Sequence, residues 1–178
     1  FMGQRFIMTA FGKDRPGIAA DVTEILYDNG CNLEDTSMTL LAGEFTLILL
    51  FTGASPEVGA PLAKACRRLE QEKGISAFIR PLEPKEATPP SGFFTRALHV
   101  EGLDHAGIVY KVSRFLADNR INIVNLKSTV KASPESGTAM YFMDIAVQIP
   151  DGTAMDPVEK GLAAVADNLN VDIVISDT

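Results

Sequence analysis

The chain has 178 residues with a formal net charge of -7 at pH 7, and hydrophobic residues make up 46% of it. This length suits one ordinary domain or two small ones, and the hydrophobic content predicts a folded core rather than disorder. An acidic chain lacks the basic surface that grips nucleic-acid phosphates or anionic membranes, so neither is expected as a direct partner.

No apolar run approaches the roughly 20 residues that span a bilayer. No basic region followed by a long apolar segment marks a signal peptide. The two cysteines, Cys31 and Cys66, are too few for a disulfide framework or a metal site. We therefore expect a cytoplasmic protein with buried, reduced thiols and with no metal or cofactor.

The chain contains an internal repeat at an offset of 90 residues. Nine of the 21 positions from 12 to 32 are identical to their counterparts in the second half, among them Gly17 with Gly107. We interpret this as a tandem duplication, with domains at 4–82 and 94–177 joined by a linker at 83–93. Prolines at positions 84, 89 and 90 disfavour helix and sheet pairing in that linker.

The first repeat predicts six elements, from β-branched and aromatic runs for strands and 3.6-residue spacing for helices. Asp14 is a plausible N-cap of the first helix, with Pro16 in its first turn, and Asn29-Gly30 ends it. Leu41-Ala42-Gly43 is a hairpin signal. The predicted elements are strand 5–11, a helix opening at 14–17, strands 32–40 and 44–52, a helix through 58–69 and strand 75–82.

The second repeat predicts the same order with a longer hairpin at 131–137. Its elements are strand 96–101, helix 106–118, strands 121–131 and 139–149, helix 155–168 and strand 170–176. The order βαββαβ, given twice, is typical of the α+β class with two ferredoxin-like domains, each an antiparallel sheet with helices on one face.

The strand at 45–51 is apolar on both faces. Phe45 and Leu47 share one face, whereas Ile48 and Leu50 lie on the other. The wet face of an isolated sheet is normally polar, so we expect the other repeat or a second chain to cover it.

The segment 12–36 resembles an ACT domain, a small module that senses amino acids in metabolic regulators. Asp14-Arg15-Pro16-Gly17-Ile18 and Asn29-Gly30-Cys31-Asn32-Leu33 carry the resemblance. Two such modules with nothing else attached resemble the glycine cleavage system transcriptional repressor family. That resemblance implies a regulatory protein, not an enzyme, that senses a small amino acid such as glycine and acts through a regulatory protein partner. It leaves a homodimer open.

ACT modules that sense amino acids use the loop after the first strand and the asparagine that opens the second. The resemblance therefore implies a binding set of twelve residues: Asp14, Arg15, Pro16, Gly17, Ile18 and Asn32, with Asp104, His105, Ala106, Gly107, Ile108 and Asn122. Backbone N–H groups of residues 16–18 or 106–108 would meet the ligand carboxylate at a helix N-terminus, and Asp14 or Asp104 its amine.

The second loop departs from the pattern, because His105-Ala106 replaces Arg15-Pro16. Gly12 and Gly102 also stand where some amino-acid-binding ACT modules carry a histidine. The first repeat is therefore the stronger candidate site, since Arg15 adds positive potential and Pro16 presets the turn.

Each site residue also has a structural interpretation. The aspartates can cap helices, the glycines can serve close helix–sheet packing, and the asparagines can tie a turn to a strand. Three other functions stay open: a ligand-free adaptor, a small acylphosphatase-like enzyme using Arg15, and an RNA-binding module of the same topology. The sequence shows no catalytic residue set. His99 is expected on the sheet face away from the helices.

Overall fold

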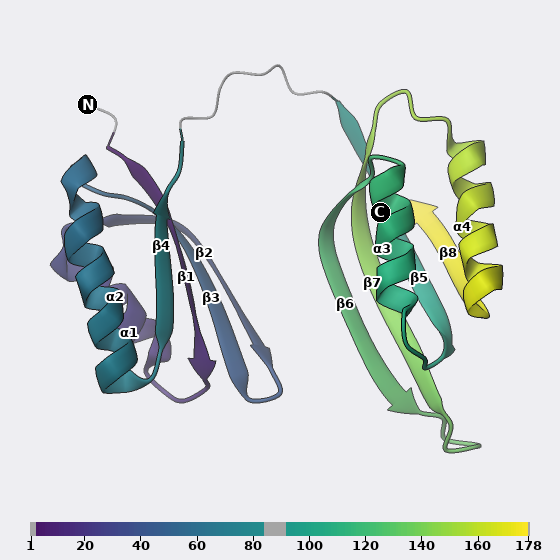
Figure 1. Ribbon diagram of the computed structural model, residues 1–178, viewed down its shortest axis with the longest axis horizontal. Coiled ribbons are helices and arrows are strands. Elements are labelled where there is room, and N and C mark those ends of the chain that lie inside the picture. Colours follow the sequence, from purple (N-terminus) through teal and green to yellow (C-terminus); the bar gives the residue numbers. More distant parts are fainter. Residues whose placement is uncertain (1–2, 84–91, 178) are drawn as a thin grey trace. The chain divides into compact units, whose positions relative to one another are not determined.

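The computed structural model describes residues 3–83 and 92–177 and divides into two compact units, 1–87 and 88–178 (Figure 1). Most of the predicted linker at 83–93 lies outside the described residues, and the first strand of the second unit begins at Phe93. Each unit is therefore described by itself.

The first unit is a four-stranded antiparallel sheet with both helices on one face (Figure 1). The sheet order is β2-β3-β1-β4, so β2 and β4 form its edges. In chain order the elements are β1 (Arg5–Lys13), α1 (Ile18–Asp28), β2 (Asn32–Leu41), β3 (Glu44–Thr52), a 3-10 turn (Pro56–Val58), α2 (Gly59–Lys73) and β4 (Ser76–Pro81).

The second unit has the same order and the same sheet arrangement, β6-β7-β5-β8. Both predicted βαββαβ repeats, and the longer second hairpin, are confirmed. The elements are β5 (Phe93–Leu103), α3 (Ile108–Asp118), β6 (Asn122–Ala132), β7 (Ala139–Pro150), α4 (Met155–Leu169) and β8 (Val171–Asp177).

Alternating strand residues and one stripe of each helix build the core of the first unit, because side chains alternate across a strand and recur every three to four residues on a helix. In β3 the four helix-facing residues are at most 3% exposed. The buried set is Phe6, Met8, Ala10, Ile18, Val22, Ile25, Leu26, Phe45, Leu47, Leu49, Phe51, Leu62, Cys66, Leu69 and Ile75.

The starts of the first helices differ from the prediction. α1 begins at Ile18 with Gly17 as N-cap, so Asp14 does not cap it and Pro16 precedes it. α3 begins in the same way, after Gly107. The reason is the left-handed φ of both glycines, which turns the chain into the helix one turn later than an Asp14 cap would.

The sheet face away from the helices differs between the units. In the first unit it carries Phe11, Ile48 and Phe78, which are 44%, 42% and 65% exposed. In the second, His99 lies on this face as expected, and its Nδ1 is 2.7 Å from an Asp144 carboxylate oxygen. That ion pair, helped by Glu101, raises the pKa of His99. Coverage of the apolar face by another module or chain stays a prediction.

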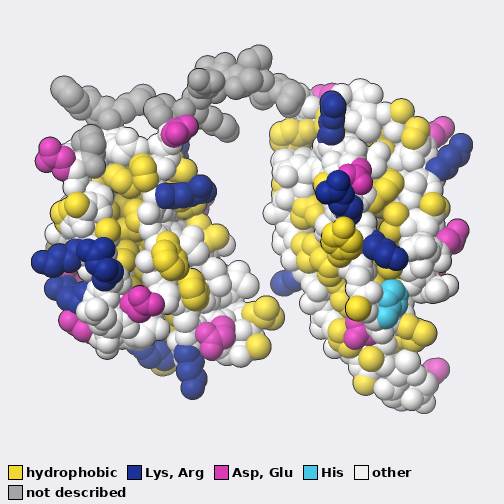
Figure 2. All heavy atoms as spheres, in the orientation of Figure 1, with side chains coloured by type: hydrophobic (Ala, Val, Ile, Leu, Met, Phe, Trp, Pro, Cys, Tyr) yellow, Lys and Arg dark blue, Asp and Glu magenta, His cyan; other side chains and the backbone are white. Residues whose placement is uncertain are grey.

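Basic and acidic side chains are interspersed over the visible surface of both units in Figure 2. The surface in that view presents no broad basic patch, which agrees with the net charge of -7.

Candidate functional site

The two β–α loops have the same backbone. Gly17 has φ 90° and ψ -4°, and Gly107 has φ 97° and ψ -3°. Both values lie in the region that residues with a side chain avoid. An added Cβ would meet only Arg15 Nη1 at 3.8 Å in the first loop, and nothing within 4 Å in the second. Close helix–sheet packing is therefore the wrong interpretation of these glycines, because their backbone angle is what requires them.

Each loop places the first backbone donors of a helix beside an exposed carboxylate. The first helical hydrogen bond of α1 runs from Asp21 N–H to Gly17 O, and in α3 from Lys111 N–H to Gly107 O. The N–H groups of residues 18–20 and 108–110 therefore precede the helical ladder. Pro16 has no N–H, which removes it from the predicted donors. The Asp14 and Asp104 carboxylates are exposed and make no hydrogen bond within the described residues.

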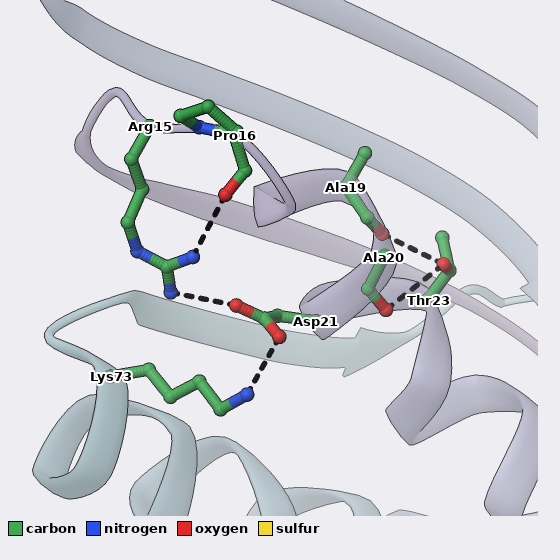
Figure 3. A network of polar contacts seen from close by, with 7 residues as sticks. All are labelled: Arg15, Pro16, Ala19, Ala20, Asp21, Thr23 and Lys73. Carbon is green, nitrogen blue, oxygen red and sulfur yellow. Dashed lines mark hydrogen bonds and ion pairs between the residues drawn. The ribbon is translucent and has the colours of Figure 1, made fainter.

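Arg15 is bound within its own unit (Figure 3). Its Nη2 lies 2.6 Å from Asp21 Oδ2, and Lys73 Nζ at the end of α2 lies 2.6 Å from Asp21 Oδ1. The hydrogen bond from Lys73, followed by that from Arg15, lowers the pKa of Asp21. The guanidinium that the sequence offers for anion recruitment thus ties the loop to the C-terminus of α2.

His105 occupies the equivalent place in the second loop. Its Nε2 lies 2.7 Å from the backbone oxygen of Leu169, the last residue of α4. Beside it, Lys111 Nζ donates to Asn168 Oδ1 at 2.7 Å. A hydrogen bond therefore replaces the ion pairs of the first unit, and both loops are fastened to the end of the second helix.

Gly12 and Gly102, at the position where some amino-acid-binding ACT modules carry a histidine, lie close to neighbouring backbone and side-chain atoms. An added Cβ at Gly102 would lie 2.7 Å from Val171 Cγ1, and one at Gly12 would lie 3.1 Å from Gly74 O. Both distances are shorter than ordinary contact, so a side chain at Gly102 would require Val171 to shift, and one at Gly12 would crowd the backbone at Gly74.

The structure does not bring the asparagines to the loops of their own units. Asn32 is in register with Thr52, which pairs with Arg5 at the start of β1, whereas the loop follows Lys13 at its end. Eight strand residues separate the two levels, which corresponds to about 26 Å at ~3.3 Å per residue. In the second unit, Asn122 is in register with Gln148, which pairs with Thr95 near the start of β5, whereas the loop follows Leu103 at its end. Asn122 Nδ2 lies 3.4 Å from Gln148 Oε1.

A polar cluster that the sequence analysis did not identify surrounds the Asn32 end of the sheet. Glu34 lies at a β-bulge in β2 and accepts hydrogen bonds from Arg5, at 2.7 Å, and from Thr52 Oγ1. The Thr52 hydroxyl, followed by Arg5, lowers the pKa of Glu34. Glu34 lies within the segment 12–36 that resembles an ACT domain, but nothing in that segment identifies its partners. Arg5 and Thr52 are distant from it in sequence.

Among residues 3–83 and 92–177, no group of three His, Cys, Asp or Glu side chains is placed to hold a metal ion. No helix in that part of the chain is long and apolar enough to cross a membrane. A groove of about 750 Å³ lies between α1 and α2 beside the first loop, and its lining includes Asp21 and Lys73 but none of residues 14–18.

Comparison with known proteins agrees with this architecture. The model of the ACT domain family matches residues 4–80. The glycine cleavage system transcriptional repressor of Escherichia coli is 25% identical over 169 residues, which cover 92% of this chain and 85% of that protein. A UPF0237 protein of Methanopyrus kandleri is 29% identical over 77 residues, covering 43% of this chain and 86% of that protein.

Two solved structures match both units of the chain. An unknown protein from Galdieria sulphuraria superposes with a TM-score of 0.81 and 28% identity, with 98% of each chain covered. A proposed glycine cleavage system transcriptional repressor superposes with a TM-score of 0.71 and 23% identity, covering 99% of this chain and 98% of that one.

Proposed function

Because this tandem ACT-domain chain resembles the glycine cleavage system transcriptional repressors over most of its length, we propose that it is a cytoplasmic regulatory protein that senses a small amino acid. Glycine is the first ligand to test, on the strength of that resemblance. The net charge of -7 argues against direct DNA binding, so the signal passes to a transcriptional regulator by protein–protein contact.

The observation that carries the proposal is the pairing of opposite recognition elements in each loop. An α-amino acid presents a carboxylate and an ammonium group a few ångströms apart. The helix N–H groups suit the carboxylate, because the helix dipole and the free donors both favour an anion. The exposed carboxylate of Asp14, or of Asp104, suits the ammonium group.

Arg15 acts in this proposal as a positioning residue. Its guanidinium does not face a ligand, because its Nη2 lies 2.6 Å from Asp21 Oδ2 and so holds the loop against α1. The same ion pair weakens the acylphosphatase-like alternative, since that enzyme needs an arginine whose donors are available to a phosphate.

Asn32 and Asn122 contribute only where a second module meets the loop. Within one unit each asparagine lies at the far end of the sheet, as the register shows. A ligand that touches both a loop and an asparagine is therefore bound between two modules in this proposal, either the two units of one chain or units of two copies.

The test is calorimetry of the full chain with glycine, followed by the other 19 amino acids. We expect one of them to bind, and Asp14→Asn to lower its affinity roughly tenfold or more by removing the charge that holds the ammonium group. Since Asp14 is not a cap, stability should change by less than about 1 kcal/mol. Asp28→Asn, an exposed aspartate at the end of α1, is the matched control and should leave affinity unchanged.

If calorimetry detects no heat of binding for any of the 20 amino acids, the result contradicts the sensing proposal and favours the ligand-free adaptor. Unchanged affinity in Asp14→Asn, with a ligand that binds the wild type, would remove Asp14 from the site while leaving sensing intact.

A further inference from the structure

The groove between α1 and α2 has walls of opposite charge. Every charged residue of α1 is acidic, whereas the charged residues that α2 turns to the groove are basic with one exception. The α1 wall carries Asp21, Glu24 and Asp28, and the α2 wall carries Lys64, Arg67, Arg68, Glu72 and Lys73. The two walls therefore have formal charges of -3 and +3.

The walls meet at the end of the groove beside the loop. There Lys73 Nζ lies 2.6 Å from Asp21 Oδ1 (Figure 3). Four exposed side chains, two on each wall, make no ion pair or hydrogen bond within residues 3–83 and 92–177: Glu24, Asp28, Lys64 and Arg67. These charges face one groove without neutralising each other, so they are available to an element that lies between them.

The floor of the groove is apolar. Ile25 and Leu69 are buried beneath it, and Ala65 is half-buried between the two helices. The methylene stems of the lysine and arginine side chains extend this apolar surface up the α2 wall. The α2 lining runs over residues 61–73, which is about 18 Å of helix and matches roughly three turns of a helix laid alongside.

We propose that this groove binds one amphipathic helix of the regulatory protein partner. The apolar stripe of that helix faces the floor, its acidic flank lies over α2, and its basic flank lies over α1. The nature of the partner rests on the proposed function, whereas its place rests on the charges of the two walls. The flanking charge pairs select the partner and its orientation, and the apolar stripe supplies most of the affinity.

Asp21 connects this groove with the candidate sensing loop. Its Oδ2 accepts a hydrogen bond from Arg15 in the loop, and its Oδ1 accepts one from Lys73 in α2. Asp21 and Lys73 both line the groove. A ligand that shifts the loop therefore acts directly on the end of the surface that holds the partner helix.

The equivalent groove of the second unit lacks opposed walls. It lies between α3 and α4 with a volume of about 490 Å³, and no charged residue among those described lines it from α4. Its basic residues are already bonded, Lys111 to Asn168 and Arg114 to Asp118. We therefore expect one partner helix per chain, on the first unit.

The test is fluorescence anisotropy of the full chain with three labelled helical peptides of roughly 18 residues that share one leucine stripe. The first carries glutamates on one flank of the stripe and lysines on the other, the second lysines on both flanks, and the third glutamates on both. We expect the wild type to bind the mixed peptide at least ~10-fold more tightly than either other peptide, because each of those sets like charges against one wall.

Reversing the basic wall should change this order. Lys64→Glu/Arg67→Glu makes the α2 wall net acidic, so the mixed peptide should bind at least ~10-fold more weakly and the lysine-flanked peptide should become the tighter of the two. Neither side chain is bonded within the described residues, so the fold should persist, which circular dichroism checks. The matched control is Lys127→Glu/Lys160→Glu, which changes the net charge equally at exposed positions of the second unit and should keep the wild-type order.

Equal binding of the three peptides, no binding of the mixed peptide, or the wild-type order in Lys64→Glu/Arg67→Glu would overturn the proposal. A wild-type mass of twice 19.2 kDa in sedimentation equilibrium, lowered to the single-chain mass by that variant, would overturn it in favour of a second copy in the groove. The peptide assays contain no amino acid, so these failures leave sensing to calorimetry. A chain that binds the mixed peptide but none of the amino acids would refute sensing and retain the groove.

Discussion

The two β–α loops share a backbone and differ in how they are fastened. Gly17 and Gly107 agree within 7° in φ and 1° in ψ, and in both units the aspartate N–H bonds the hairpin opposite, at Gly43 O or Ala139 O. The first loop is held by ion pairs through Arg15, and the second by a hydrogen bond from His105. The duplication therefore kept the geometry of the loop while its electrostatics diverged.

Substitutions of the two loop glycines should have the largest effects, and these effects should be similar in the two units. Gly17→Val and Gly107→Val each force a β-branched residue into a left-handed conformation, which should destabilise the affected unit by about 2 kcal/mol. Ligand affinity should fall as well, because a side chain covers the helix N–H groups. Chemical denaturation followed by amide signals from each unit measures the loss of stability, and calorimetry measures the loss of affinity. A loss in only one unit would mean that the two loops are not equivalent in solution.

The two fastenings should respond differently to salt. His105→Ala removes a hydrogen bond to an uncharged backbone oxygen and should destabilise the second unit by about 1 kcal/mol, with little dependence on salt. Arg15→Ala removes an ion pair whose effect on the first unit should shrink as salt rises. Denaturation at 0.05 M and 1 M sodium chloride checks this. Equal salt dependence in both variants would contradict the assignment of distinct fastenings.

The smallest effect is a pH dependence confined to the first unit. The pKa of Asp21 is lowered, first by Lys73 and then by Arg15, from the ordinary value of 3.8. As pH falls, the unfolded chain therefore binds a proton at Asp21 before the folded chain does. The stabilisation that ionised Asp21 gives the first unit is present above about pH 4 and is lost as pH falls through the lower pKa of the folded state. Acid unfolding of Asp21→Asn followed unit by unit should show less acid sensitivity in the first unit and no change in the second.

The order of elements followed from the sequence because it depends on local periodicity. Alternation in 44–52 and the 3.6-residue stripe from Ile18 to Leu26 are consequences of burial on one face, and both appear in the structure. The predicted start of the first helix was wrong because aspartate is a common N-cap residue and Asp14 precedes the apolar stripe. Only the backbone shows that the left-handed Gly17 performs that function.

The site was less predictable, because its partners are distant in sequence. Lys73 meets Asp21 across 52 residues, and His105 meets Leu169 across 64. No spacing rule connects such pairs. The separation of Asn32 from its own loop follows from the strand register, which the motif alone does not contain.

That separation has a thermodynamic consequence for the proposed sensor. With the loop and the asparagine about 26 Å apart on one sheet, a small molecule that contacts both is shared between two modules. Ligand binding and the association of those modules are then coupled, so each strengthens the other by an equal factor. Where the two modules belong to separate copies of the chain, the apparent affinity for the amino acid rises with protein concentration.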